Sequence, residues 1–203
     1  MKIEQKESEV SFEMQKELTL KKVREINDLF NDRLKLLLTG NKQNFSHLDI
    51  GYPSGCLLEC SLPNLPIEVS VRVVKGKANQ SNHPFKISDI THLPDSVCNP
   101  IAVFRSATSM DDTKVILTDL EANGVNIIVV IKPNCSYARK IVNDIRSIYP
   151  KDNIKAILEW ICIYNLMEYY DKQKILNWLS KHQYNADEVT KLIKESTNLV
   201  NKN

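Results

Sequence analysis

A polar loop with one histidine and two lysines is the part of the sequence whose residue types point most directly to chemistry. It covers residues 75–84 and holds Lys75, Lys77 and His83 among small and polar side chains. Histidine exchanges a proton near neutral pH, as the acid or base of a phosphodiester cleavage must, and lysine ammonium groups bind phosphate. A lone histidine in a turn is also commonly an ordinary exposed side chain. The residues of the loop leave both interpretations open.

Apolar segments before and after this loop predict the strands that would position it. Residues 67–74 alternate between apolar and polar side chains, which is the period-2 pattern of a half-buried strand. The strands expected at 114–120 and 125–132 flank Asn123-Gly124, a pair that favours the positive φ of a tight hairpin turn. A short buried strand is expected at 101–105. Residues 138–149 fit either a helix or a strand, and periodicity alone slightly favours a helix.

Helical periodicity appears on both sides of these strands. Apolar residues recur at helical spacing from Leu18 to Leu37, and Gly40 supplies a stop signal. Short helices are expected after Pro53 and between Pro94 and Pro100. Further helices are predicted behind capping residues at Asp152 or Asn153, at Asp171 and at Asn185.

The bulk properties of the chain restrict the classes of function. Its 203 residues carry a formal charge of only +2, so any contact with nucleic acid must come from a local patch and not from the overall field. The five cysteines contain no C-x-x-C pair, which argues against a zinc ribbon and a disulfide framework and predicts packed, reduced thiols. No leader sequence and no membrane-spanning run is apparent, so we expect a cytoplasmic protein with no membrane partner.

A series of short motifs resembles a known family. The most specific motif reads Leu93-Pro94-x-x-Val97-x-Asn99-Pro100-Ile101-Ala102-Val103-Phe104. It is preceded by Ile50-Gly51-Tyr52-Pro53 and followed by Ile145-x-Ser147-Ile148-Tyr149-x-Lys151-Asp152-Asn153. In this order they resemble the phage Mu F-like C-terminal domain, over about residues 30 to 182. That family is a predicted toxin domain of phages and mobile elements, placed with the metal-independent ribonucleases of the barnase, EndoU, colicin and RelE class.

The sequence patterns and the resemblance together predict a fold and a domain division. The resemblance makes residues 144–149 a strand, which gives an α+β fold with a mainly antiparallel sheet of about four to five strands between N-terminal and C-terminal helices. Residues 1–13 would be a frayed terminus, 14–182 a single α+β toxin-like domain, and 183–203 a C-terminal helix packed on it or extending from it.

The resemblance also implies a site. Ser147 and Tyr149 would share one face of the last strand and act with His83 as catalytic residues, while Lys75, Lys77 and Lys151 would bind phosphate. The leading hypothesis is therefore a metal-independent endoribonuclease-like toxin domain that needs no cofactor and has RNA as its substrate. The rival is a catalytically silent virion cargo, inhibitor or adaptor that binds a protein partner, and an immunity protein would be one such partner. Tyr149 as a packing residue and Lys151 as a turn cation remain the simpler alternatives. Virion association is a second option for its location.

Overall fold

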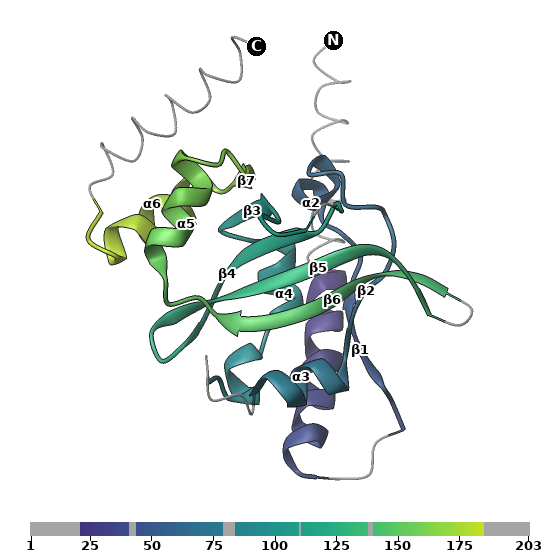
Figure 1. Cartoon of the computed structure of the whole chain (residues 1–203). Coiled ribbons are helices and arrows are strands. Elements are labelled where there is room, and N and C mark those ends of the chain that lie inside the picture. The colour runs from purple at the N-terminus through teal and green to yellow at the C-terminus, as the bar shows by residue number, and fades with distance from the viewer. Residues whose placement is uncertain (1–20, 41–43, 79–83, 110, 138–139, 185–203) are drawn as a thin grey trace, which may run out of the picture.

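A seven-stranded mixed sheet forms the middle layer of the protein (Figure 1). The computed structural model describes residues 21–40, 44–78, 84–109, 111–137 and 140–184. In the described chain the strand order is β1-β2-β6-β5-β4-β3-β7. Strands β2 and β6 run parallel, and the other neighbouring pairs run antiparallel. The prediction of four to five strands in a mainly antiparallel sheet was therefore imprecise.

Four of the predicted strands are confirmed, and two short edge strands were not predicted. Strands β5 and β6 are longer than expected, and they pair with each other to form the central hairpin. Among the described residues the strands are β1 (His47–Gly51), β2 (Ile67–Ser70), β3 (Ala102–Arg105), β4 (Lys114–Ala122), β5 (Val125–Tyr137), β6 (Lys140–Pro150) and β7 (Met167–Tyr170).

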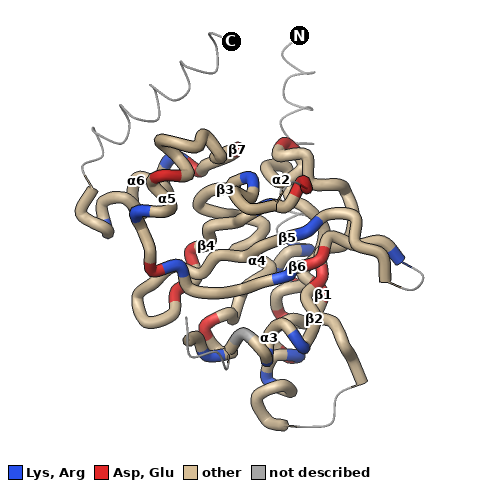
Figure 2. The backbone as a smooth tube through the Cα atoms, viewed as in Figure 1, with Lys and Arg blue, Asp and Glu red and all other residues tan. Residues whose placement is uncertain are grey.

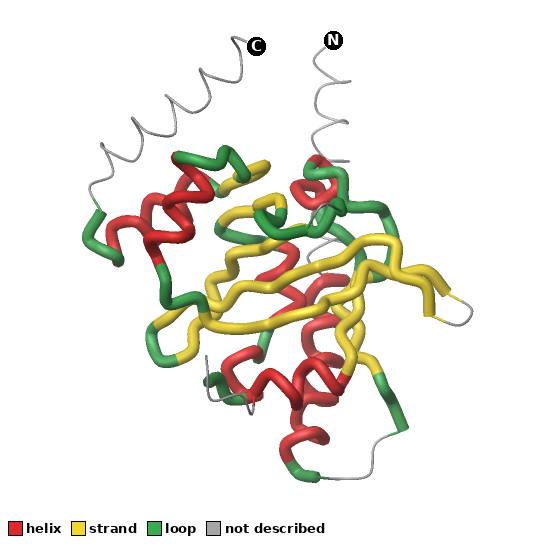
Figure 3. Tube along the Cα trace, viewed as in Figure 1, coloured by secondary structure: helices red, strands yellow, loops and turns green. Residues whose placement is uncertain are grey.

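Helices lie on both sides of the sheet (Figure 3). The predicted caps of two of them are confirmed, because Asn153 Oδ1 accepts from the backbone N–H of Ala156 and Asp171 Oδ1 accepts from that of Lys174. The described helices cover residues 21–38, α2 (Gly55–Glu59), α3 (Val71–Ala78), the 3₁₀ helix η1 (Ile87–Ile90), α4 (Leu93–Cys98), α5 (Ile154–Cys162) and α6 (Lys172–Lys181).

The strand predicted over 67–74 is wrong beyond Ser70. The chain turns into α3 there, since the Ser70 hydroxyl accepts a hydrogen bond of 3.1 Å from the backbone N–H of Val73 and so caps the helix. Val71, Val73 and Val74 all pack on the core; the spacing of Val71 and Val73 fits a strand, whereas that of Val71 and Val74 fits one face of a helix. The pattern was ambiguous, and the polar cap decided it.

The segment 138–149 forms a strand over its described part, from Lys140 onward, as the resemblance implied and against the slight preference of its periodicity. The turn at the other end of β5 is also as predicted. Asn123 and Gly124 have φ values of 52° and 78°, the left-handed values that a two-residue hairpin turn requires.

Two hydrophobic cores hold the layers together. On one face, the helix over 21–38 packs with α3, η1 and α4 against the strands through residues such as Phe30, Val74 and Ile148. On the other face, α5 and α6 pack through Ile157 and Trp178. The described part of this second core draws on β3, β4 and β5 and includes no residue of β1 or β2. Among the described residues, the half of this face toward β1 and β2 therefore lacks the cover of α5 and α6, and we call it the uncovered face.

None of the described helices has the length and apolar character that a membrane crossing requires.

Candidate active site

Two β-bulges gather polar side chains on the uncovered half of the sheet. In the β5–β6 pairing, Val130 lies opposite Ser147 and Ile131 lies opposite Ile145, so Arg146 is an extra residue. A bulge of this kind re-aims side chains, and here it leaves Arg146 and Ser147 on the same face as Asp144.

The second bulge has the same effect on β5. Between the pairs Lys132 with Asp144 and Cys135 with Val142, β5 uses one residue more than β6. Asn134 in this bulge has a φ of 55°. The extra residue restores the alternation, so Lys132, Cys135 and Tyr137 all point to the uncovered face.

Asp144 is the centre of this arrangement, which we call the β5–β6 cluster (Asp144, Arg146, Tyr137 and Cys135). Its side chain is only 3% exposed. One carboxylate oxygen, Oδ2, forms an ion pair with Arg146 Nε at 2.8 Å and accepts a hydrogen bond of 2.5 Å from the Tyr137 hydroxyl. Burying a charged carboxylate is costly unless it is paired, so Arg146 and Tyr137 offset the cost of placing Asp144 there.

Arg146 is the member of the cluster that faces solvent. Its side chain is 50% exposed, although its Nε forms an ion pair with Asp144 and one Nη donates to Cys135 Sγ at 3.2 Å. A guanidinium has five N–H groups, and contacts within the described chain use two of them. Asp144 and Cys135 therefore hold the guanidinium in place while part of it stays exposed to solvent. This arrangement suits the binding of a phosphate group.

Further charges lie opposite Asp144 on the neighbouring strands, where Figure 2 shows both red and blue segments near the labels β1, β5 and β6. The Cα register places Asp49 opposite Glu68, Glu68 opposite Asp144, and Asp144 opposite Lys132. Lys140 donates to both oxygens of Glu68 at 2.6 Å. Three acidic positions in succession are therefore followed by one basic position, and Lys140 adds a cation beside Glu68, so the row is not a purely basic patch.

Lys132 at the end of this row contacts the loop between β3 and β4. Its ammonium lies 2.7 Å from Asp111 Oδ2. The hydrogen bond from Lys132, with others from Ser109 and Thr113, holds the pKa of Asp111 well below its usual range. This contact fixes the loop against the site.

An aromatic pair borders the cluster on the β1 side. The rings of His47 and Tyr137 lie 5.3 Å apart between centroids, with a tilt of 56°. Partial burial, together with the hydrogen bond to Asp144, raises the pKa of Tyr137 to about 12. The phenol therefore keeps its proton and remains a donor at physiological pH.

The structure separates the site residues that the sequence predicted on β6 and just after it. Ser147 lies on the uncovered face next to Arg146. Tyr149 lies further along the same face but packs under α5, where burial raises its pKa. The ammonium of Lys151 lies 5.3 Å from the centroid of the Trp160 ring, as a cation–π contact. Of these three residues, Ser147 alone lies beside the β5–β6 cluster.

The other predicted residues lie elsewhere or outside the described chain. Lys75 and Lys77 are on α3 and not in a loop, so the predicted loop 75–84 was wrong over its first residues. Because α3 packs on the core opposite to that of α5 and α6, Lys75 stands across the sheet from Ser147. His83 lies outside the described residues.

Sequence reasoning missed Asp144, Arg146, Tyr137 and Lys132. A signal was present, since Asp144 and Arg146 are charged residues inside a strand segment rich in isoleucine and valine. A charge in that context is expected only if it is paired or exposed. Which face they share depends on the two bulges, which periodicity does not reveal.

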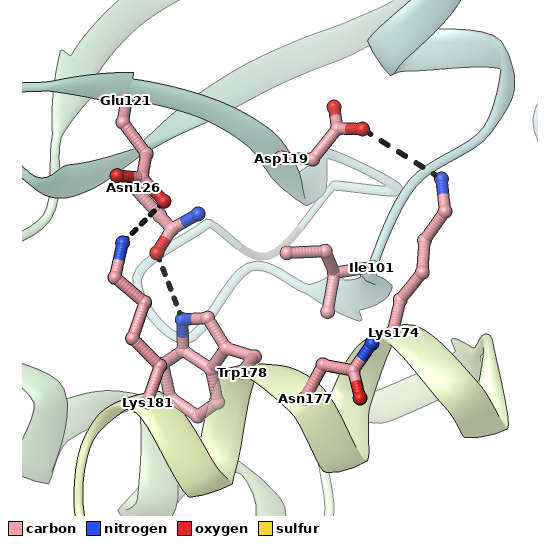
Figure 4. Close-up of a pocket in the computed structure, with 8 residues that line it drawn as sticks. All are labelled: Ile101, Asp119, Glu121, Asn126, Lys174, Asn177, Trp178 and Lys181. Atoms are coloured by element: carbon pink, nitrogen blue, oxygen red, sulfur yellow. Dashed lines mark hydrogen bonds and ion pairs between the residues drawn. The ribbon is translucent and has the colours of Figure 1, made fainter.

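A small cavity of about 220 Å³ lies between α6 and the β4–β5 hairpin (Figure 4). Its polar groups contact one another: Lys181 donates to Glu121, Lys174 lies 3.9 Å from Asp119, and the Trp178 indole donates to Asn126 Oδ1 at 3.1 Å. Since these groups are already paired with one another, we interpret their contacts as the junction that holds α6 on the sheet.

A larger cavity of about 490 Å³ adjoins the first and shares Asp119 and Lys174 with it. Cys56 and Cys98 line it, and burial, with Asp95 nearby, raises the pKa of Cys98 to about 11. A thiol with so high a pKa is a poor nucleophile at neutral pH. All five cysteines of the chain are free thiols.

Comparison with known proteins adds one result. The model of the family described as the phage MuF-C-terminal domain matches residues 74–177, slightly more than half of the chain. The chain belongs to the phage MuF-C-terminal domain family. No curated protein and no solved structure matches it.

The MuF-C-terminal match contains the whole β5–β6 cluster. It begins within α3 and ends within α6, so it includes Tyr137, Asp144 and Arg146. It starts after β1, so His47 lies outside it. The cluster is thus part of the family domain, and His47 is contributed by the N-terminal segment of this chain.

Proposed function

We propose that this MuF-C-terminal domain is an endoribonuclease-like toxin of phage or mobile-element origin, and that the β5–β6 cluster is its active site. The observation that carries the proposal is Arg146: a half-exposed guanidinium fixed from below by Asp144 and Cys135 on an uncovered sheet face. Preorganised donors of this kind stabilise charge that develops in a transition state, because they need no reorganisation during the reaction.

The reaction supplies its own nucleophile. The ribose 2′-oxygen attacks the adjacent phosphorus, the bond to the 5′-oxygen breaks, and the 2′-proton is removed as the 5′-oxygen gains one. A 2′,3′-cyclic phosphate and a 5′-hydroxyl result. Arg146 would stabilise the extra negative charge on the phosphorane, while Asp144 and Tyr137 hold the guanidinium in place. Ser147, which lies beside Arg146 on the same face, would orient a phosphate oxygen.

Proton transfer is assigned to His83 by the sequence, and that assignment stays a prediction. Tyr149 and Lys151 are left out of the proposed site because Tyr149 packs under α5 and Lys151 contacts the Trp160 ring. Lys75 is left out because it lies across the sheet, and Lys77 is on the same helix.

The test is RNA cleavage and growth arrest on expression, for wild type, Arg146→Ala and Arg146→Lys. Loss of one oxyanion-type donor lowers the rate by about 10²- to 10³-fold. Arg146→Lys should restore little of the cleavage rate, since one ammonium group cannot contact Asp144, Cys135 and a phosphate at the same time. Lys155→Ala is the control, because Lys155 lies on α5 with 84% of its side chain exposed. Cleavage should survive EDTA. Wild-type protein that leaves RNA intact would refute the proposal.

A second candidate is a catalytically silent protein that binds a partner, such as a virion component or an immunity protein. Exposed apolar side chains after α5 favour it, since Ile163 and Tyr164 are 68% and 58% exposed. An inactive wild type that captures a defined partner through Ile163 and Tyr164 would support this candidate over the enzyme.

A further inference from the structure

We propose that the rings of His47 and Tyr137 form a stacking platform for one unpaired base, which makes single-stranded RNA the substrate. This inference rests on the proposed function, because it places the base beside the cluster that would bind the adjoining phosphate.

The two rings are held in fixed positions. His47 begins β1, where it pairs with Ser70, and its Nδ1 is 3.0 Å from the Ser46 hydroxyl. The Tyr137 hydroxyl is tied to Asp144. Both side chains are only partly buried, so part of each ring faces solvent. A ring that is already fixed loses little conformational entropy when a base stacks on it.

The charge of this face limits what phosphate contacts can contribute to binding. The named groups are four carboxylates, Asp49, Glu68, Asp111 and Asp144, against three cations, Lys132, Lys140 and Arg146. Each of the three cations has a carboxylate partner. Phosphate attraction is therefore weak here, apart from the donors that Arg146 keeps. Contacts with bases must supply most of the affinity.

Stacking on these rings requires an exposed base face. In a double helix the faces are covered by neighbouring base pairs, whereas single strands, loops and ends present them. Aromatic side chains stack on any base, so the platform favours single strands without strict sequence preference. The Tyr137 hydroxyl and Arg146 Nε contact the same oxygen of Asp144, at 2.5 Å and 2.8 Å, which puts the platform next to the phosphate donors.

The experiment measures binding and not cleavage, with a labelled single-stranded RNA whose 2′-hydroxyls are methylated so that it cannot be cut. Fluorescence anisotropy would compare wild type, His47→Ala and His47→Phe, with Lys155→Ala as control and a duplex of the same sequence as competitor. His47→Ala should weaken binding by about 5- to 150-fold, the usual loss for one stacked base. His47→Phe should restore it, because a phenyl ring stacks but moves no proton. The duplex should compete poorly.

Salt supplies a second readout. Few phosphate contacts predict a shallow decline of log affinity with log salt, by about 0.7 per phosphate contacted on a single strand. Equal affinity for duplex and single strand, or no effect of His47→Ala, would overturn the platform. If wild-type protein binds RNA as expected here but does not cleave it, the proposed function is refuted and the stacking platform is supported.

Discussion

Asp144 and Arg146 lie two positions apart on β6 and form an ion pair of 2.8 Å in which one partner is buried and the other is half exposed. The bulge at Arg146 keeps the side chains of Asp144, Arg146 and Ser147 together on the uncovered face. The buried carboxylate positions the guanidinium, and the guanidinium meets the solvent.

Asp144→Asn should reduce the free energy of unfolding by about 1–3 kcal/mol, the cost of losing hydrogen bonds to a charged buried group. The loss stays below that of a fully buried pair because Arg146 can be rehydrated. Urea denaturation measures it, with Lys155→Ala, at an 84% exposed position, expected within about 0.5 kcal/mol of wild type. An Asp144→Asn variant with the same free energy of unfolding as wild type would show that the ion pair contributes nothing to stability.

The two glycines Gly124 and Gly76 should respond to substitution with opposite signs. Gly124 has a φ of +78° in the hairpin turn, so Gly124→Val should destabilise by about 1–2 kcal/mol, although there is space for a side chain. Gly76 lies inside α3 with open space around it, so Gly76→Ala should stabilise by about 0.5–1 kcal/mol. Denaturation midpoints that move in the same direction would contradict one of the two backbone assignments.

Asn126 should be the main polar support of α6. It is 3% exposed, accepts from the Trp178 indole and donates to Thr118 O at 3.1 Å. Asn126→Ala leaves both partners buried and unpaired, at about 1–3 kcal/mol for each. Adding Trp178→Phe removes the orphaned N–H, so the double variant should lose less stability than the two single losses added. Strict additivity in a double-mutant cycle would mean that the two side chains do not interact.

The elements predicted from sequence are those whose signal is local. The run of apolar residues in β5, the Asn123-Gly124 turn and the cap at Asn153 each act within a few residues. Strands β1 and β7 were missed because each has only four or five residues and depends on pairing with a partner distant in the sequence.

The site was predicted less well for a related reason. Ser147 was placed on the correct strand, but the face it shares with Arg146 is set by register shifts between β5 and β6. One residue more or less in a strand moves its side chains to the other face. Lys75 was assigned to a loop because Val71 and Val73 fit a strand, and the cap at Ser70 that makes the segment helical is a single hydrogen bond.

The last prediction concerns Tyr137 and alkaline pH. A tyrosine in an unfolded chain has a pKa of roughly 10, and in the folded protein burial and the bond to Asp144 raise the pKa of Tyr137 to about 12. Between these values the folded state holds a proton that the unfolded state has lost. The contribution of Tyr137 to stability is therefore fully present below about pH 10 and declines as the pH rises toward 12.

The difference in unfolding free energy between wild type and Tyr137→Phe, measured in urea from pH 8 upward, should be constant at first and then shift against wild type above about pH 10. Asp144→Asn should narrow the window, because it removes the second cause of the raised pKa. A difference that stays constant through the whole range would show that the phenol titrates alike in both states.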